Sequence, residues 1–229
     1  MAHVLDNPVW NALISGNKPL AHGSAQVKLF AADVSPFVGF AHVSLVAFNQ
    51  LRSLVPAGQR LGIISPGALA VPTEWLVSGP MRVWQMVQVR PKRGRVAGTP
   101  PLRPLGLAHV PAMLALTRWT NPGPFFSNTL VFGHYEGVFD GEELVAMAGQ
   151  RLHVGPYTEI SAVCTHPEYL GRGYASQLLH SQAQRMRAAG NTPFLHVRTD
   201  NAKAVRVYEA QGFEVRKELS IYLISMRPL

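Results

Sequence analysis

Cysteine, acidic residues and long apolar runs are all scarce in this sequence of 229 residues. A single cysteine, Cys164, excludes a disulfide within the chain and a zinc site built from several cysteines. The most apolar stretches, such as residues 37–48, are interrupted by polar residues well before the roughly 18 residues that a membrane-spanning helix needs. The first ten residues lack the basic start of a secretory signal. We therefore expect a globular cytoplasmic protein without a membrane partner.

Acidic residues are too few to balance the basic ones. The chain has 21 Lys and Arg against 13 Asp and Glu, which gives a formal net charge of +8. Such a charge attracts phosphates, acidic ligands and nucleic acid alike, so it does not select among them. Charged residues make up only 15% of the chain and apolar residues 47%, which excludes a disordered or collagen-like protein.

Prolines and basic residues gather in residues 90–104, which have no periodic apolar pattern and are predicted to be a linker or long loop. Aromatic residues are not interleaved with its basic cluster, so a solvated linker is favoured over a nucleic-acid patch. This cluster consists of Arg90, Lys92, Arg93 and Arg95. We expect an N-terminal α+β domain in residues 1–95, a linker in 96–102 and a larger domain in 103–229.

Local patterns predict helices and strands on both sides of this linker. Before it, we expect a helix that starts at Pro8, a helix over 45–54 capped by Ser44, and strands over 27–30, 61–64 and 82–89. After it, we expect helices over 109–118, 173–189 and 202–211, and strands over 135–139, 144–152, 157–165, 194–198, 213–215 and 219–225. Three of the four tryptophans, Trp75, Trp84 and Trp119, are interpreted first as packing residues and second as an acceptor pocket. The fold class is therefore α/β.

A glycine-rich turn follows the strand expected over 157–165. The run from Leu170 to Ala175, with Gly171 and Gly173 inside it, opens an amphipathic helix. Glycines allow backbone N–H groups to converge on an anion, and a helix N-terminus adds about half a positive charge. A strand, turn and helix of this kind are typical of a pyrophosphate site, although a short G-x-G is a weak signal by itself.

Downstream residues strengthen the pattern. Asn201 stands at the expected start of the next helix, Tyr208 lies two turns further, and Gly212-Phe213 ends it. In this order the motifs resemble motifs A and B of the GNAT superfamily of acyl-CoA-dependent N-acetyltransferases, over residues 103–229. The first half is similar, more loosely, to the N-terminal region of two-domain members related to glycine N-acyltransferases. The resemblance implies a mixed, splayed central sheet flanked by helices, with residues 1–95 interpreted as a degenerate half of the same fold.

By this resemblance, acetyl-CoA is the co-substrate and no metal is required. The backbone of Val163, Cys164 and Thr165 would pair with pantetheine like an added strand. Backbone amides of the turn would hold the pyrophosphate, namely those of Leu170, Gly171, Arg172, Gly173, Tyr174, Ala175 and Ser176. The family usually has Gln or Arg where this chain has Leu170, so one side-chain contact is expected to be lost. Asn201 is expected to cap its helix, to contact the cofactor, or both.

Acetyl transfer needs a neutral amine, a polarised thioester carbonyl and a proton for the departing thiolate. Glu159 matches the position from which a family glutamate deprotonates the amine, and the alternative is a solvated strand carboxylate. Tyr208 matches the general acid of the family, and the alternative is core packing. Cys164 and His166 are rejected as a thiol-enzyme site, because no orienting acid stands at a recognisable place.

The expected function is transfer of an acetyl group from acetyl-CoA to a primary amine of a small molecule or protein, by direct attack in a ternary complex. A non-catalytic acyl-CoA-binding or regulatory module and a transferase for a longer acyl group are alternatives. A nucleic-acid binder ranks last, so no specific nucleic acid is expected as a partner. The sequence leaves open the acceptor, the acyl-chain preference and the oligomeric state, with a homodimer among the alternatives.

Overall fold

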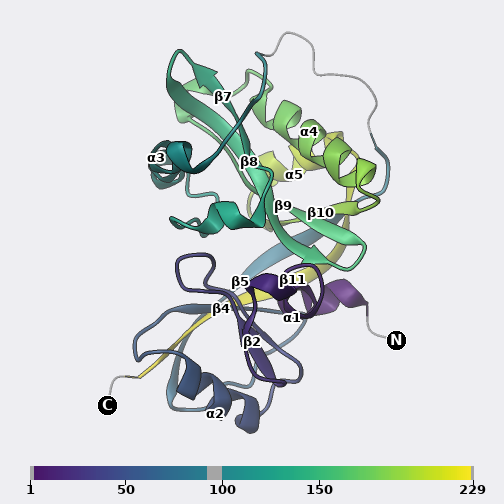
Figure 1. Cartoon of the computed structure of the whole chain (residues 1–229). Helices are drawn as coiled ribbons and strands as arrows, with labels where there is room; N and C mark the ends of the chain where they lie inside the picture. The colour runs from purple at the N-terminus through teal and green to yellow at the C-terminus, as the bar shows by residue number, and fades with distance from the viewer. Residues whose placement is uncertain (1–2, 92–99, 228–229) are drawn as a thin grey trace.

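The computed structural model describes residues 3–91 and 100–227. Its main feature is an eight-stranded mixed sheet in the order β4-β11-β5-β10-β9-β8-β7-β6, with helices on both faces (Figure 1). These strands are β4 (Leu61–Ser65), β5 (Trp75–Gln88), β6 (Arg103–Pro104), β7 (Glu136–Asp140), β8 (Glu143–Val154), β9 (Tyr157–Thr165), β10 (Thr192–Arg198) and β11 (Phe213–Met226). A smaller three-stranded sheet contains β1 (His22–Gly23), β2 (Val27–Leu29) and β3 (Val38–Phe40). The fold is thus mixed α/β, as predicted.

The helices begin and end close to the residues expected from the sequence. They are α1 (Pro8–Ile14), α2 (Leu45–Leu54), α3 (Val110–Thr120), α4 (Tyr174–Ala188) and α5 (Ala202–Ala210). Pro8 opens α1, and the Ser44 hydroxyl accepts a hydrogen bond from the Ala47 N–H at 3.2 Å at the start of α2. In the described part of the chain, no helix is both long and apolar enough to cross a bilayer.

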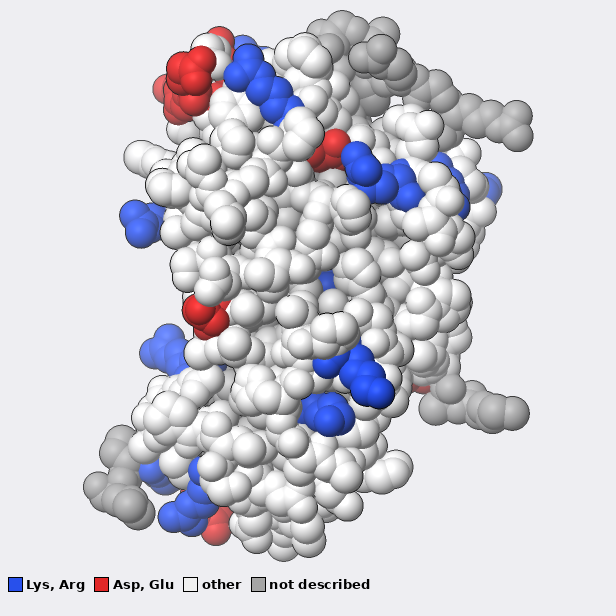
Figure 2. All heavy atoms as spheres, viewed as in Figure 1, with Lys and Arg blue, Asp and Glu red and all other residues white. Residues whose placement is uncertain are grey.

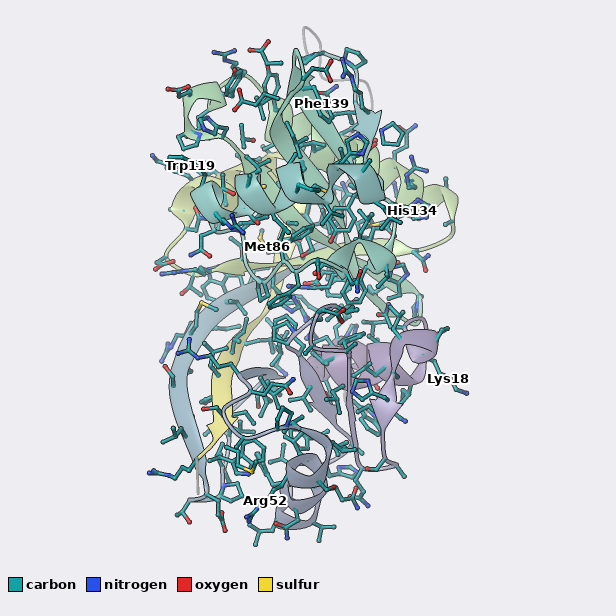
Figure 3. All side chains as sticks on the ribbon, turned by 60° about the vertical axis from the view of Figure 1, so that its left-hand side comes forward. Lys18, Arg52, Met86, Trp119, His134 and Phe139 are labelled. Carbon is teal, nitrogen blue, oxygen red and sulfur yellow. The ribbon has the colours of Figure 1, made fainter. Side chains whose placement is uncertain are left out.

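The two faces of the large sheet carry separate cores. Met86 and Leu195 pack with α4 and α5 on one face, whereas Val83 and Phe194 pack with α1 on the other. This alternation follows from the period of two along a strand. A third cluster joins α3 to β7, β8 and β9 on the face opposite α4, where α3 crosses in front of the sheet (Figure 3). Trp75 is buried as expected, but Trp119 on α3 is 73% exposed, so the packing interpretation is wrong for that residue.

The C-terminal end of the chain differs from the prediction. The two short strands expected over 213–215 and 219–225 are one strand, β11, which pairs with β5 over most of its length and with β4 on its other side. A register shift between Val215 and Lys217 interrupts the side-chain alternation there. Backbone pairing with β5 keeps the chain extended where the apolar pattern alone indicates a break.

The large sheet combines strands from both sides of the expected linker. β4 and β5 come from residues 1–95, and β11, which lies between them, comes from 103–229. Residues 96–99 of the linker, together with Lys92, Arg93 and Arg95, lie outside the described residues. The division into two domains stays a prediction.

Candidate active site

The parallel strands β9 and β10 separate after a short paired stretch. They pair at three positions only, with Tyr157 opposite Thr192, Thr158 opposite Pro193 and Glu159 opposite Phe194. β10 continues to Arg198 along β5, and β9 continues to Thr165 along β8. Among the described strands, none pairs with the β10-facing edge of β9 beyond Glu159. Backbone groups of Val163, Cys164 and Thr165 therefore lie on a strand edge that can accept an extended ligand.

A bulge in β9 accompanies this separation. Ala162 has φ of +53°, which is the left-handed region, and the register with β8 shifts between the pairs Gly149–Ser161 and Met147–Cys164. A bulge bends the strand that carries it and increases its twist. Around the bulge, Ala162 and Cys164 pack in the cluster that joins α3 to the sheet, whereas Val163 packs on the opposite face with Tyr208.

The glycine-rich turn stands where β9 leads into α4. Gly171 and Gly173 have φ of +79° and +81°, and Gly173 is the residue before the first turn of α4. No side chain caps this helix, and the Gln177 N–H is already bonded to the Gly173 carbonyl at 3.0 Å. The N–H groups of the first turn have no partner within the helix and carry the positive end of its dipole. The turn thus has the backbone geometry that the sequence predicts, and its role as an anion site stays a prediction.

Side chains near the turn add detail that the sequence did not show. Leu170 is 65% exposed and offers no polar atom, while the Arg172 guanidinium lies over the Tyr169 ring at 4.5 Å. The hydroxyl of Thr165 and Oε1 of Gln177 are buried without a hydrogen-bond partner among the described residues. An unpaired buried polar atom is costly, so both atoms are candidates for ligand contacts. Only burial, which needs the tertiary structure, could reveal them.

Tyr208 lies on α5, and Asn201 is the residue immediately before this helix. Tyr208 is half-buried, and its ring packs edge-on to Phe213 in the cluster that also contains Val163. Burial raises the pKa of Tyr208 to about 12, so the phenol stays protonated at neutral pH. The Asn201 side chain accepts a hydrogen bond from the Ala204 N–H at 3.1 Å, which confirms its capping role.

Glu159 lies at the last paired position of β9, but not as a free carboxylate. Its side chain is fully buried, Oε1 and Oε2 accept hydrogen bonds from Arg151 at 2.6 and 2.8 Å, and Oε1 lies 2.7 Å from Nδ1 of His196. Burial alone would raise its pKa, but Arg151 and His196 outweigh burial and lower the pKa to about 2. The alternative of a solvated strand carboxylate is therefore wrong. The role as base stays a prediction, and such a pKa makes a weak base.

Cys164 does not have the environment of a reactive thiol. It is 6% exposed, and burial raises its pKa to about 11. Reactive cysteines have lowered pKa values in electropositive, accessible places. The structure thus agrees with the rejection of a thiol-enzyme site.

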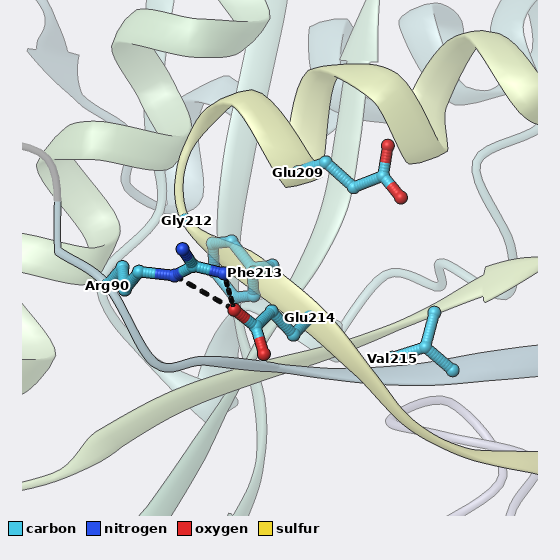
Figure 4. A pocket seen from close by; sticks show the side chains of 6 residues that line it. All are labelled: Arg90, Glu209, Gly212, Phe213, Glu214 and Val215. Atoms are coloured by element: carbon cyan, nitrogen blue, oxygen red, sulfur yellow. Dashed lines mark hydrogen bonds and ion pairs between the residues drawn. The ribbon is translucent and has the colours of Figure 1, made fainter.

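A surface pocket lies outside the glycine-rich turn. It has a volume of about 420 Å³ and is lined by Arg90, Glu209, Gly212, Phe213, Glu214 and Val215, at the end of α5 remote from Asn201 (Figure 4). Arg90 and Glu214 already form an ion pair within it.

Charges do not define a second site on the face drawn in Figure 2. Lys and Arg side chains are spread along this face instead of forming one stripe. Residues 3–91 and 100–227 contain no group of three or more His, Cys, Asp and Glu that could hold a metal ion.

Comparison with known proteins identifies a matching family model and several relatives. Residues 135–221 match the family model described as FR47-like protein. Mycothiol acetyltransferase of Corynebacterium glutamicum is 35% identical over 86 residues, which are 37% of this chain and 30% of that protein. N-alpha-acetyltransferase RimI of Mycobacterium tuberculosis is 37% identical over 84 residues, which are 35% of this chain and 52% of that protein. The match thus spans between about a third and about a half of these relatives.

Solved structures extend the similarity to the whole chain. A GNAT-family protein from Novosphingobium aromaticivorans is 33% identical, with a TM-score of 0.90, over 99% of this chain and 100% of that one. A GCN5-related N-acetyltransferase from Kribbella flavida is 14% identical, with a TM-score of 0.68 over 98% and 96% of the two chains, which shows the shared fold alone. The match to the Novosphingobium aromaticivorans protein includes residues on both sides of the linker expected in this chain.

Proposed function

This chain belongs to the GNAT family of acetyltransferases, and from that premise we propose that it transfers an acetyl group from acetyl-CoA to a primary amine. The observation that carries the proposal is the open edge of β9 leading directly into an uncapped helix N-terminus at Gly173. An extended amide chain followed by a pyrophosphate matches these two features in the same order. The likeness of residues 1–95 to the glycine N-acyltransferase branch stays a prediction.

Acetyl-CoA would lie along β9 and over the turn. Backbone groups of Val163, Cys164 and Thr165 would pair with the pantetheine amides, and the amides from Leu170 to Ser176 would bind the pyrophosphate. The Thr165 hydroxyl, buried and unpaired among the described residues, would supply one further polar contact. Leu170 contributes only its backbone, because its side chain has no polar atom.

The chemistry follows from this placement. The neutral amine attacks the thioester carbonyl, whose oxygen is polarised by backbone N–H near Val163, and the C–S bond breaks as the C–N bond forms. The nitrogen loses one proton and the departing thiolate gains one, so charge balances. Tyr208 shares a cluster with Val163 and, with its raised pKa, is a hydrogen-bond donor throughout the neutral range. It would therefore stabilise and protonate the thiolate.

The acceptor is proposed only as a class, a primary amine of a small molecule or a protein. Two of the relatives carry different names, one a mycothiol acetyltransferase and the other an N-alpha-acetyltransferase. Their matches cover 37% and 35% of this chain, whereas the acceptor is bound by loops and side chains that differ within a fold.

Calorimetric titration of the purified protein with acetyl-CoA tests the proposal, with adenosine 3′,5′-bisphosphate as the control for simple attraction of phosphates to a basic protein. We expect binding at one site per chain that is tighter than the control. Release of free thiol from acetyl-CoA in the presence of a panel of amines then tests transfer. Binding without release for any amine supports the non-catalytic module, and no binding rejects the site.

A further inference from the structure

The position of Glu159 in the sheet is unusual for a residue that exchanges protons with a substrate. It forms the last pair between β9 and β10, opposite Phe194. From that point its side chain reaches Arg151 on β8 and His196 on β10. One carboxylate thus connects three neighbouring strands where two of them begin to separate.

The carboxylate has no free lone pair for an amine. Oε1 accepts from Nη2 of Arg151 at 2.6 Å and contacts Nδ1 of His196 at 2.7 Å. Oε2 accepts from Nε of Arg151 at 2.8 Å and from the Leu152 N–H at 3.4 Å. Four donors satisfy the acceptor capacity of an ionised carboxylate. The side chain is also fully buried, which denies access to bulk water.

His196 is equally occupied. Its Nε2 lies 3.0 Å from Nε2 of Gln85, which also donates to the Leu5 carbonyl at 2.9 Å, and Gln85 Oε1 accepts from Arg216. These contacts fix the amide so that its N–H faces the imidazole. His196 must then accept through Nε2 and donate through Nδ1 to Glu159. Neither ring nitrogen is available to a substrate.

We infer that Glu159 is a positioning residue that does not deprotonate the amine. It holds β8 and β10 against β9 at the point where β9 and β10 separate, and so sets the geometry of the acetyl-CoA site. The inference rests on the proposed function. Arg151 is itself enclosed, with its guanidinium over the Phe37 ring at 5.0 Å, so loss of the Glu159 charge would leave a buried cation without its partner. Breaking such a pair is strongly destabilising, and the strands it joins would shift.

Glu159→Gln tests this role, with Glu218→Gln as the matched control on the exposed ion pair with Arg82. By calorimetry, we expect acetyl-CoA to bind Glu159→Gln about tenfold more weakly, because loss of the ion pair with Arg151 would let the strands that form the site shift. Glu218→Gln should bind like the wild type. In thiol release with an amine that the wild type accepts, kcat at saturating acetyl-CoA and the shape of its pH profile should be retained. Unchanged affinity together with a fall in kcat of about 10²-fold or more would identify Glu159 as the base and overturn the inference.

Two variants of His196 give an independent answer if Glu159→Gln does not fold. His196→Asn keeps a donor near the position of Nδ1, whereas His196→Leu does not. We expect wild-type-like affinity for acetyl-CoA in His196→Asn and several-fold weaker binding in His196→Leu, and equal affinities in the two variants would overturn the inference. A wild type that fails to bind acetyl-CoA would instead reject the proposed function, which distinguishes the two failures.

Discussion

The carbonyl oxygen of Arg90 occupies the space that a side chain on Gly212 would need. A Cβ atom added to Gly212 would stand 1.7 Å from that oxygen, and Gly212 has φ of +83°. The Gly212 carbonyl in turn accepts hydrogen bonds from the N–H groups of Val89 and Arg90, at 3.0 and 3.2 Å. The end of β5 is thus joined directly to the turn between α5 and β11.

Gly212→Ala should therefore be strongly destabilising, by roughly 3 kcal/mol or more, because backbone strain and a clash with backbone add together. Gly190→Ala is the matched control, since its φ is +79° but an added Cβ meets nothing within 4 Å. There we expect a loss of only about 1 kcal/mol. Urea unfolding of both variants checks the difference, and equal losses would contradict the clash.

Tyr208→Phe should lower turnover by roughly 10²-fold while the affinity for acetyl-CoA stays close to that of the wild type. The substitution removes the hydroxyl that would protonate the thiolate but keeps the ring that packs against Phe213. Steady-state kinetics and calorimetry on the same preparation measure the two effects separately. Wild-type turnover in this variant would assign Tyr208 to packing alone.

Leu170→Gln should strengthen acetyl-CoA binding by about fivefold, because an amide in this exposed position can make one hydrogen bond of about 1 kcal/mol with the cofactor. Leu107→Gln is the control, since Leu107 is also highly exposed but lies in the short 3-10 helix Leu107–His109 that precedes α3. Calorimetric titration of both variants is the measurement. A loss of affinity in Leu170→Gln would show that the leucine itself contacts the ligand.

Acid should weaken the fold through Glu159. Its pKa is about 2 in the native protein against an ordinary value of 4.5, so its contribution is complete above pH 4.5 and disappears as the pH falls from 4.5 toward 2. The contribution is on the order of 3 kcal/mol. Arg151 and His196 also lose their anionic partner when Glu159 is protonated.

Denaturant unfolding of the wild type and Glu159→Gln at pH 6 and pH 3 measures this contribution. The stability difference between the two proteins should shrink toward the lower pH. Arg216 and Lys217 also lower the pKa of Asp6, although burial opposes this. Asp6 titrates in both proteins, so its contribution cancels from the difference in stability. A difference that is the same at both pH values would contradict the linkage.

Much of the site could be predicted from the sequence because its signals are local. The positive φ angles of Gly171 and Gly173 and the capping side chain of Asn201 depend on residues only a few positions apart. The boundaries of β9 were predicted correctly for the same reason, since its apolar pattern ends at a proline two residues beyond Thr165. By contrast, the apolar pattern of β11 breaks where pairing with β5 keeps the strand extended.

The sequence by itself therefore determined where the turn, the helix starts and most strands lie, because backbone conformation and capping are decided by neighbours along the chain. Only the tertiary structure decided what surrounds Glu159. Alternation along a strand does not say which face is buried, and His196 is 37 residues away, on a strand that becomes a neighbour only when the sheet forms. The same holds for the unpaired hydroxyl of Thr165 and the exposed ring of Trp119, because burial depends on the packing of elements far apart in the sequence.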